Sequence, residues 1–333
     1  MAQERRNNGG VTVFDVAEHA GVSIATVSRA LSGTRSMSEG LRTRVQDSAR
    51  TLGYQVNLVG RALRQKKTST LGLIIPDLEN PFFSSLAQRI SRRFGESEVD
   101  VLIASADNDK AQEKRAVQSF LGRQVDALVM IPTDEVESEE ALLLASEYVP
   151  TIQFDRQVPH LPIPYIGCDN AAGMDLVGAY LETSVDTSSQ PVILVGGGES
   201  SSSGRERSSE FLTAQSPVLH LEGSFSFSWG QKAAKQILKR GFQTATIVTG
   251  ADVIALGVIS WLTSAGHKIP DDFRVIGFDD VGVAQLSHPT LTTVRQPVEE
   301  MTEAIKTLMQ EATGSPAPTS QRFAPELIVR ASG

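Results

Sequence analysis

The segment IATVSRAL, residues 24–31, carries polar side chains that could bind a nucleic acid. Thr26, Ser28 and Arg29 occur where a helix that buries a core would carry more leucine. Hydroxyl groups hydrogen-bond phosphate oxygens, and an arginine can make paired hydrogen bonds to the edge of a guanine. If the segment is helical, its outer face carries Ile24, Ala25, Thr26, Ser28 and Arg29. This pattern predicts a helix that enters a DNA major groove.

Two short helices and a glycine turn would position this face. Thr12 precedes VFDVAEHA and is followed three residues later by Asp15, a variant of the capping box. Gly21 can adopt the positive φ of a tight turn, and Ser23 can cap the second helix. Two short helices joined in this way are the helix-turn-helix signature. A third amphipathic helix over residues 38–53 would complete a three-helix core.

Other candidate sites lack the spacing that catalysis or metal binding requires. The cluster GGGESSSSG would need a glycine in place of Ser201 to match a dinucleotide fingerprint, and it has no Gly-Lys-Ser/Thr end for a phosphate loop. Asp279 and Asp280 are adjacent, so on an extended segment their carboxylates point to opposite sides. The histidines show no metal-ligand spacing. We therefore expect no enzyme activity, no cofactor and no bound metal.

Charge divides the chain into a basic N-terminal part and an acidic remainder. Residues 1–67 contain 11 Lys and Arg against 5 Asp and Glu, and residues 68–333 contain 20 against 34. This asymmetry indicates that only the N-terminal part meets a polyanion. The chain has one cysteine, Cys168, a polar N-terminus and no long apolar run. We expect a cytoplasmic, nucleoid-associated protein that does not enter a membrane.

From Thr70 onward, short apolar runs alternate with amphipathic segments. Continuous apolar strands separated by helices are typical of parallel sheets covered on both faces. One set of candidate strands is LGLIIP, VDVLIAS, DALVMIP, PTIQFD and YIGCD, and a second is PVILVGG, ATIVTG, FRVIGFDD and LTTVRQP. Two sets predict two doubly wound lobes, which bind ligands outside the carboxyl ends of their strands.

The chain resembles the LacI/GalR (lac-repressor) family of bacterial transcription regulators. The family patterns, near DVAxxAGVSxxTVSRxLNG and LGYxPNxxARxLR, are matched by DVAEHAGVSIATVSRALSG and LGYQVNLVGRALR. The resemblance extends from Val11 to the C-terminus and implies a body like the periplasmic pentose-binding proteins. The expected fold class is α/β, with an N-terminal three-helix helix-turn-helix head and two doubly wound parallel-sheet lobes.

The resemblance also implies a hinge helix after the head and three crossings between the lobes, near residues 166, 296 and 322. The expected ranges are 1–56 for the DNA-binding domain, 57–69 for the hinge helix and linker, 70–166 with 296–321 for the first lobe, and 167–295 with 322–333 for the second.

In this family, the hinge helix folds when two copies pair on DNA, and a leucine wedges into the minor groove. The matching residue is Leu63. Gly60 stands where the family has alanine, and glycine inside a helix costs about 1 kcal/mol, so we expect a hinge that depends strongly on DNA and dimerisation. The DNA-binding residues implied are Thr12, Ser23, Ile24, Ala25, Thr26, Ser28, Arg29, Asn57, Arg61, Leu63 and Arg64. Arg29 is the candidate for guanine, because Ile24 and Ala25 can contact only thymine methyl groups.

Several residues at strand ends match the pentose-binding pattern of the body. Aromatic rings cover the apolar faces of a sugar, while carboxylates and guanidiniums hydrogen-bond its hydroxyls. The effector-binding residues implied are Asn80, Phe82, Phe83, Asn108 (or Asp107), Asp155, Arg156, Arg207, Phe225, Asp279 and Gln296. Ala251 replaces an asparagine common in the family, so a pentose, a polyol and a nucleoside all stay open.

These observations predict a ligand-responsive transcription regulator, a repressor of carbohydrate or nucleoside metabolism genes. We expect a homodimer on a pseudo-palindromic operator, with a small sugar-like effector between the lobes that changes the spacing of the hinge helices. Two alternatives stay open: control of the body by a protein partner, as in catabolite control, and a purine or nucleoside corepressor. A sugar-binding transport component is disfavoured by the DNA-binding head.

Overall fold

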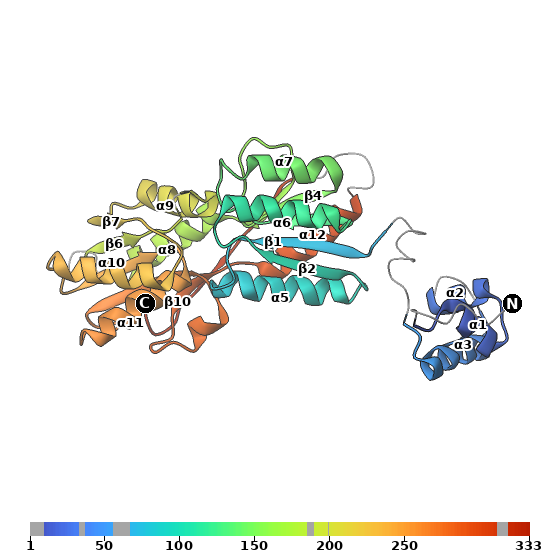
Figure 1. The fold of residues 1–333 in the computed structure, drawn as a ribbon. Helices are drawn as coiled ribbons and strands as arrows, with labels where there is room; N and C mark the ends of the chain where they lie inside the picture. Colours follow the sequence, from blue (N-terminus) through green and yellow to red (C-terminus); the bar gives the residue numbers. More distant parts are fainter. Residues whose placement is uncertain (1–9, 33–36, 56–66, 185–189, 199, 312–318) are drawn as a thin grey trace. The chain divides into compact units, whose positions relative to one another are not determined.

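A computed structural model describes residues 10–32, 37–55, 67–184, 190–198, 200–311 and 319–333 (Figure 1). The chain divides into two compact units, Met1–Thr68 and Ser69–Gly333. The first unit is coloured dark blue in Figure 1, and the second runs from light blue to red.

The first unit is a three-helix head, as predicted. It contains α1 (Val13–Ala20), α2 (Ile24–Ser32) and α3 (Glu39–Leu52). The backbone N–H and the hydroxyl of Thr12 both donate to the Asp15 carboxylate, at 2.8 and 2.7 Å, which fixes the start of α1. Gly21 ends α1 with a φ of 63°, a conformation that glycine adopts without strain. The helices enclose a small core of Val16, Ala17, Ala20, Val27, Ala30, Val45 and Ala49.

The first lobe of the second unit is built on a parallel sheet with the strand order β11-β5-β4-β3-β1-β2. Its elements are β1 (Thr70–Ile75), α5 (Pro81–Gly95), β2 (Asp100–Ser105), α6 (Lys110–Gly122), β3 (Ala127–Met130), α7 (Glu139–Tyr148), β4 (Thr151–Phe154), β5 (Tyr165–Cys168), α12 (Val298–Glu311) and β11 (Gln321–Phe323). In Figure 1, α5 lies on one side of this sheet and α6 and α7 lie on the other. Leu73 of β1 belongs to the core cluster that includes α5, whereas Ile74 packs with α6 and α7. Burial on both faces explains why these strands are apolar at successive positions.

The second lobe repeats this arrangement with the strand order β12-β10-β9-β8-β6-β7. Its elements are α8 (Asn170–Ser184), β6 (Val192–Val195), α9 (Ser202–Ala214), β7 (Leu219–Leu221), α10 (Phe227–Lys239), β8 (Ala245–Thr249), α11 (Asp252–Ser264), β9 (Phe273–Asp279), the 3-10 helix η1 (Gly282–Gln285), β10 (Thr292–Arg295) and β12 (Glu326–Ile328). The strands are parallel except for β12, which is antiparallel to β10. Both sheets are doubly wound, and such folds bind ligands at the carboxyl ends of their strands.

The structure corrects two details of the sequence analysis. Three short strands, β7, β11 and β12, were not predicted from the sequence. Each lies at the edge of its sheet, where one side is unpaired and charged side chains are tolerated, so the apolar signal is weak. The lobe boundaries expected at residues 166 and 321 fall inside β5 and β11, because both strands remain in the first sheet beyond those positions.

The contact between α10 and α11 gives a first prediction. A Cβ atom on Gly257 would lie 2.1 Å from the backbone oxygen of Phe227, and one on Gly230 would lie 2.1 Å from that of Ile254. Gly257→Ala should therefore lower the stability of the body by about 1–3 kcal/mol, the usual cost of overpacking. Gly122→Ala is the matched control, because its Cβ would meet nothing within 4 Å. Urea unfolding followed by circular dichroism measures both, and an unchanged midpoint for Gly257→Ala would contradict this account of the helix contact.

Candidate functional site

The outer face of α2 is exposed in the head. Ile24, Ala25 and Arg29 are exposed, whereas Val27 and Ala30 are buried in the head core. The Arg29 Nε donates to the backbone oxygen of Ala25 at 3.1 Å. This arrangement leaves one face of α2 accessible to a partner.

Two hydroxyl groups predicted to contact DNA also have local roles. The Ser23 hydroxyl accepts a hydrogen bond from the Thr26 backbone N–H at 3.2 Å and lies 2.9 Å from the Thr26 hydroxyl oxygen. Ser23 therefore caps α2, as predicted. Ser28 is half-buried. The remaining residues of the predicted DNA-binding set, Asn57, Arg61, Leu63 and Arg64, lie outside the described residues.

In the second unit, residues from both sheets form a buried polar and aromatic cluster between the lobes. Its first-lobe members follow β1 and β4, and its second-lobe members lie on α9, before α10 and at the end of β9. Gln296 follows β10, where the chain crosses between the lobes. All are buried except Phe225, which is half-buried. We call this set the interlobe cluster: Asn80, Phe82, Phe83, Asp155, Arg156, Arg207, Phe225, Asp279 and Gln296.

Arg207 holds the second-lobe half of the interlobe cluster. Its Nε donates to the Asn170 side-chain oxygen at 2.8 Å, and its Nη1 donates to the Gly250 backbone oxygen at 2.9 Å and lies 3.3 Å from Asp279 Oδ1. The guanidinium carbon lies 3.7 Å from the centroid of the Phe278 ring. The Gln296 amide nitrogen also donates to Asp279 Oδ1, at 2.8 Å. These contacts fix Arg207 and Asp279 in one geometry.

Arg156 holds the first-lobe half and also contacts the second lobe. Its guanidinium carbon lies 5.1 Å from the ring centroid of Phe83 and 5.2 Å from that of Phe225. Asp155 precedes it with a φ of 59°, a left-handed conformation that is uncommon for a non-glycine residue. Burial lowers the pKa of Arg156 to about 10, and burial raises the pKa of Asp155. This sandwich of a cation between two rings joins the two lobes.

Three buried polar atoms of the interlobe cluster have no hydrogen-bond partner. They are Asp155 Oδ1, Arg156 Nε and Gln296 Oε1; among the residues described, only Arg42 Nε and Glu113 Oε1 share this property. An unsatisfied buried polar atom costs roughly 1–3 kcal/mol, more if it is charged. Two acceptors and one donor at one place suit a ligand hydroxyl, which both donates and accepts.

Asn80 and Phe82 have structural roles beside their place in the cluster. The Asn80 side-chain oxygen accepts a hydrogen bond from the Phe82 backbone N–H at 3.0 Å, which caps α5. The rings of Phe82 and Phe83 meet edge to face, with centroids 5.3 Å apart. The start of α5 is thereby fixed against the cleft between the lobes.

One predicted residue is not brought into the interlobe cluster. Asn108 is exposed, and its backbone N–H donates to the Pro76 oxygen. Its side chain lines a separate pocket of about 500 Å³ together with Lys110, Lys114 and Glu137. The alternative residue, Asp107, accepts a hydrogen bond from the Ser105 hydroxyl at 2.9 Å. Both follow β2, the edge strand of the first sheet, whereas the first-lobe residues of the cluster follow the inner strands β1 and β4.

Three residues of the site were missed in the sequence analysis. Asn170 and Phe278 position Arg207, and Asp252 fixes the start of the loop that follows Asp279. The Asp252 carboxylate is fully buried and accepts hydrogen bonds from the Val281 backbone N–H, at 2.9 Å, and from a threonine hydroxyl of β10. The only signal for them in the sequence is their place at a strand end or a strand–helix junction. Ala251, which replaces the family asparagine, is buried.

On the side of the cleft next to α9, direct contacts bridge the lobes. Arg205 of α9 donates from Nε to both carboxylate oxygens of Glu135, at 2.8 and 2.9 Å. The Glu135 backbone N–H donates to the Ser200 oxygen at 2.7 Å. These contacts connect the loop after β3 in the first lobe to the start of α9 in the second.

Two further bridges lie along α9. The Gln157 backbone N–H donates to the Ser202 hydroxyl at 2.8 Å, and Arg322 of β11 makes a bidentate pair with Glu206 at 2.9 Å for each bond. Burial raises the pKa of Glu206, but the hydrogen bonds from Arg322 and Asn170 outweigh it, so that the pKa is lowered overall. Glu206 is therefore ionised at neutral pH, and the bridge is charged.

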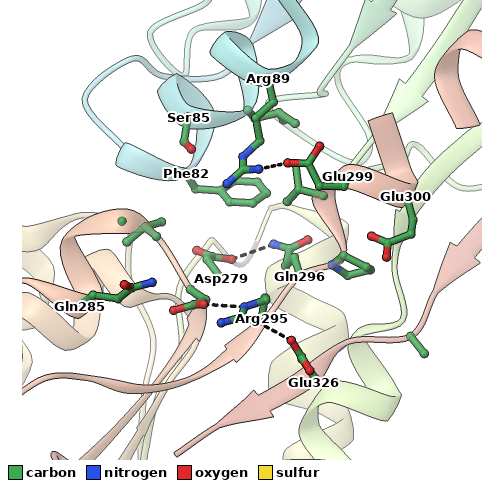
Figure 2. A pocket seen from close by; sticks show the side chains of 17 residues that line it. Phe82, Ser85, Arg89, Asp279, Gln285, Arg295, Gln296, Glu299, Glu300 and Glu326 are labelled. Carbon is green, nitrogen blue, oxygen red and sulfur yellow. Dashed lines mark hydrogen bonds and ion pairs between the residues drawn. The ribbon is translucent and has the colours of Figure 1, made fainter. Parts of the chain in front are cut away.

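On the side next to α5, the cleft opens into a pocket of about 680 Å³, which we call the α5 pocket. Figure 2 shows Phe82, Ser85 and Arg89 of α5 facing Asp279 and Gln285 of the second lobe. The pocket shares Phe82, Asp279 and Gln296 with the interlobe cluster. The remaining lining residues are Leu86, Asp280, Val281, Gly282, Arg295, Pro297, Val298, Glu299, Glu300, Ala324 and Glu326.

Two other kinds of site are absent from the residues described. In that part of the chain, His, Cys, Asp and Glu form no group of three or more that could hold a metal ion. Within the same residues, no helix is long and apolar enough to cross a membrane.

The buried carboxylate of Asp279 generates a prediction on pH dependence. Burial raises the pKa of Asp279 to about 7, although Arg207 opposes the shift. A carboxyl group with a raised pKa in the folded state contributes stability at low pH, and this contribution is lost as the pH rises through about 7. The stability of the body should therefore decrease between pH 5 and pH 8, and Asp279→Asn should show a smaller decrease.

Urea midpoints of both proteins at pH 5 and pH 8 measure this difference. Asp109→Asn is the control, because Asp109 is exposed and serves as the N-cap of α6. Equal pH dependence in the wild type and Asp279→Asn would show that Asp279 ionises at its ordinary pKa.

Comparison with known proteins identifies the family. A family model described as bacterial regulatory proteins, lacI family, matches residues 12–57, and one described as a periplasmic binding protein-like domain matches residues 190–333. The HTH-type transcriptional regulator DegA of Bacillus subtilis is 32% identical, covering 96% of this chain and 97% of that protein. The ribose operon repressor of Escherichia coli K12 is 28% identical, with coverage of 96% and 99%.

A crystal structure of the lac repressor dimer bound to operator and the anti-inducer ONPF has a TM-score of 0.85 and 25% identity, with coverage of 97% of this chain and 99% of that one. These similarities span both units and confirm the resemblance inferred from the sequence motifs. The chain therefore belongs to the LacI family of bacterial regulatory proteins and is a transcription regulator.

Proposed function

We propose that this chain is a repressor that acts in the cytoplasm as a homodimer on a pseudo-palindromic operator. A two-fold symmetric protein presents two recognition helices to two half-sites, which explains the usual symmetry of such operators. The exposed outer face of α2, with Arg29 near its centre, supports a role in reading bases in the major groove. The surplus of Lys and Arg over residues 1–67 supports binding to a polyanion.

We propose that the effector of this regulator is a small polyhydroxylated molecule bound at the interlobe cluster. The observation that carries this proposal is that three buried polar atoms, on Asp155, Arg156 and Gln296, have no hydrogen-bond partner, although Arg156 Nε lies 4.0 Å from Asp155 Oδ2 in an ion pair. Phe83 and Phe225 supply apolar ring faces beside them. Buried aromatic surface with a few directional polar groups is the usual composition of a small-molecule site.

Effector binding would control DNA affinity through the arrangement of the lobes. A ligand that binds one arrangement better shifts the population toward it, by no more than its difference in affinity for the two. The residues that bind the effector come from both lobes, so ligand contacts depend on how the lobes are placed. An inducer fits this scheme if the ligand-bound arrangement separates the two hinge segments of the dimer.

The test is a mobility-shift titration of the purified chain on promoter fragments and on random duplex of equal length. Each series is run without ligand and with pentoses, polyols and nucleosides. We expect preference for one promoter fragment and a change in its affinity with one ligand class. Absence of any preference, with and without ligands, would overturn the proposal. A preference that no small molecule changes would favour control by a protein partner.

Arg207→Ala should weaken effector binding and leave operator affinity unchanged. Loss of hydrogen bonds to a charged group, at roughly 1.5–3 kcal/mol, corresponds to about a 10- to 100-fold loss of affinity. Calorimetry measures the effector and the mobility shift measures the operator. Arg123→Ala, a change at an exposed arginine after α6, is the control. If operator binding fails while effector binding persists, the role assigned to Arg207 is wrong.

Leu63→Ala should have the opposite effect. The family resemblance makes Leu63 the minor-groove wedge. Kinking a base step costs a few kcal/mol, and the bent DNA recovers this cost through added contacts with the protein. Loss of part of those contacts should weaken operator binding by about tenfold or more. Effector affinity should not change. Calorimetry measures effector affinity and the mobility shift measures operator affinity. Leu58→Ala, in the same segment, serves as the control. Normal operator affinity in Leu63→Ala would refute its assignment as the wedge.

A further inference from the structure

The loop between β3 and α7, residues 131–138, reaches across the cleft to the second lobe. We call it the β3–α7 loop. The Glu135 backbone N–H donates to the Ser200 oxygen at 2.7 Å, and the Glu135 carboxylate oxygens lie 2.8 and 2.9 Å from Arg205 Nε. The Glu135 side chain is 15% exposed, although Arg205 is 48% exposed. The position of Glu135 therefore determines the contact of the loop with α9.

Hydrogen bonds within the β3–α7 loop give it a tight turn. The Asp134 carboxylate accepts bonds from the backbone N–H groups of Val136 and Glu137, both at 2.8 Å. The Asp134 backbone N–H donates to the Ser138 hydroxyl at 3.2 Å. These bonds join residues of the loop to one another. They shape the turn around Glu135, but a fixed position on the first lobe requires contacts outside the loop.

Glu113 of α6 joins the β3–α7 loop to the rest of the first lobe. Its side chain is fully buried, and its Oε2 accepts a hydrogen bond from the Thr133 backbone N–H at 2.8 Å. The Thr133 hydroxyl lies 3.4 Å from the Ser138 hydroxyl at the other end of the loop. Burial raises the pKa of Glu113, although hydrogen bonds with Ser138 and Thr133 oppose the shift. The loop thus has a buried polar attachment to α6.

Packing alone does not explain a carboxyl group at residue 113. The neighbouring inner residues of α6, Val117 and Phe120, are apolar and pack against α7. A glutamate is almost never fully buried unless it is paired. Glu113 Oε1 is buried without a partner, and such an atom lowers stability. The bond to Thr133 is therefore a role that an apolar side chain in this place could not fill.

Two ion pairs that connect α6 to the loop and to α7 are exposed. Lys110 pairs with Glu137 and Lys114 pairs with Glu140, and all four side chains are at least 39% exposed. Ion pairs between exposed side chains contribute little, because water and salt screen them. The buried carboxylate of Glu113 therefore fixes the loop more firmly than these pairs do.

We propose that Glu113 is a positioning residue for the bridge between the lobes. By holding Thr133, it places Glu135 against the start of α9. Two residues of chain span at most about 7 Å, so a displacement of Thr133 is passed on to Glu135. A hydrogen bond weakens when it is stretched by more than a few tenths of an ångström. Glu113 thereby helps to set the balance between bridged and separated lobes, and this role does not depend on the chemistry of the effector.

Hydrogen exchange of the full-length chain at neutral pH, resolved to single residues by mass spectrometry, tests this role. The reporter is the Glu135 amide, because its acceptor lies in the second lobe. Glu113→Met keeps the length of the side chain and removes its acceptor oxygens, so exchange at Glu135 should be at least about tenfold faster. Glu113→Gln retains an oxygen that can accept from Thr133, so exchange should stay within about twofold of the wild type. The Val117 amide, in the middle of α6, should exchange at the wild-type rate in both variants.

Arg205→Met tests the same coupling from the second lobe. Arg205 is half-exposed, so this variant also serves if Glu113→Met does not fold. Coupling between two sites is reciprocal, so the Thr133 amide should exchange faster in Arg205→Met although its acceptor lies in the first lobe. The double variant should exchange at Glu135 no faster than the faster single variant, because both changes break one bridge. Glu139→Met is the matched control, since Glu139 is exposed at the start of α7, and it should behave as the wild type.

Three results would overturn the inference. They are unchanged exchange at Glu135 in Glu113→Met, unchanged exchange at Thr133 in Arg205→Met, and effects that multiply in the double variant, which would show two independent contacts. Faster exchange throughout α6 in Glu113→Met would place the effect in the folding of the first lobe and also count against it. These measurements need neither operator nor effector, so a failure of the proposed function would leave their outcome unchanged.

Discussion

The buried ion pair of Arg207 and Asp279 is the interaction on which the second-lobe half of the site depends. Removing one partner of such a pair leaves an uncompensated buried charge, at a cost of several kcal/mol. Arg207 also bonds Asn170 and the Gly250 oxygen and lies on the ring of Phe278. Its single position therefore fixes the start of α8, the turn after β8 and the end of β9 relative to α9. The geometry that faces the cleft follows from this constraint.

In the first lobe, the buried cation is Arg156, and it is stabilised by contacts with two aromatic rings. Arg156 lies between Phe83 of its own lobe and Phe225 of the other, so its charge is shielded from water by rings from both lobes. Because Phe83 and Phe225 belong to different lobes, a change in lobe arrangement would alter the contacts of this cation with the two rings. The residues that we propose to bind the effector therefore also make contacts that depend on how the lobes are placed, which suits the proposed control of DNA affinity by lobe arrangement.

Much of the fold could be predicted from the sequence because it is encoded in local patterns. Apolar runs such as LGLIIP mark strands buried on both faces, and Thr12, Gly21 and Ser23 mark helix ends by their own hydrogen bonds and φ preferences. Strands β7, β11 and β12 were missed because short edge strands carry little apolar signal. The residues of the interlobe cluster were inferred from a family pattern. That pattern also included Asn108, which instead lines a different pocket.

The sequence by itself determined the family, the helix-turn-helix, the two sets of strands and the types of side chain at the strand ends. Only the tertiary structure decided which of those side chains meet. The convergence of Asp155, Arg156 and Gln296, and the support of Arg207 by Asn170 and Phe278, join segments far apart along the chain. The physical reason is that the hydrogen-bond partners of a buried polar side chain come from segments far apart in the sequence. Only the packing of the two lobes brings those segments together.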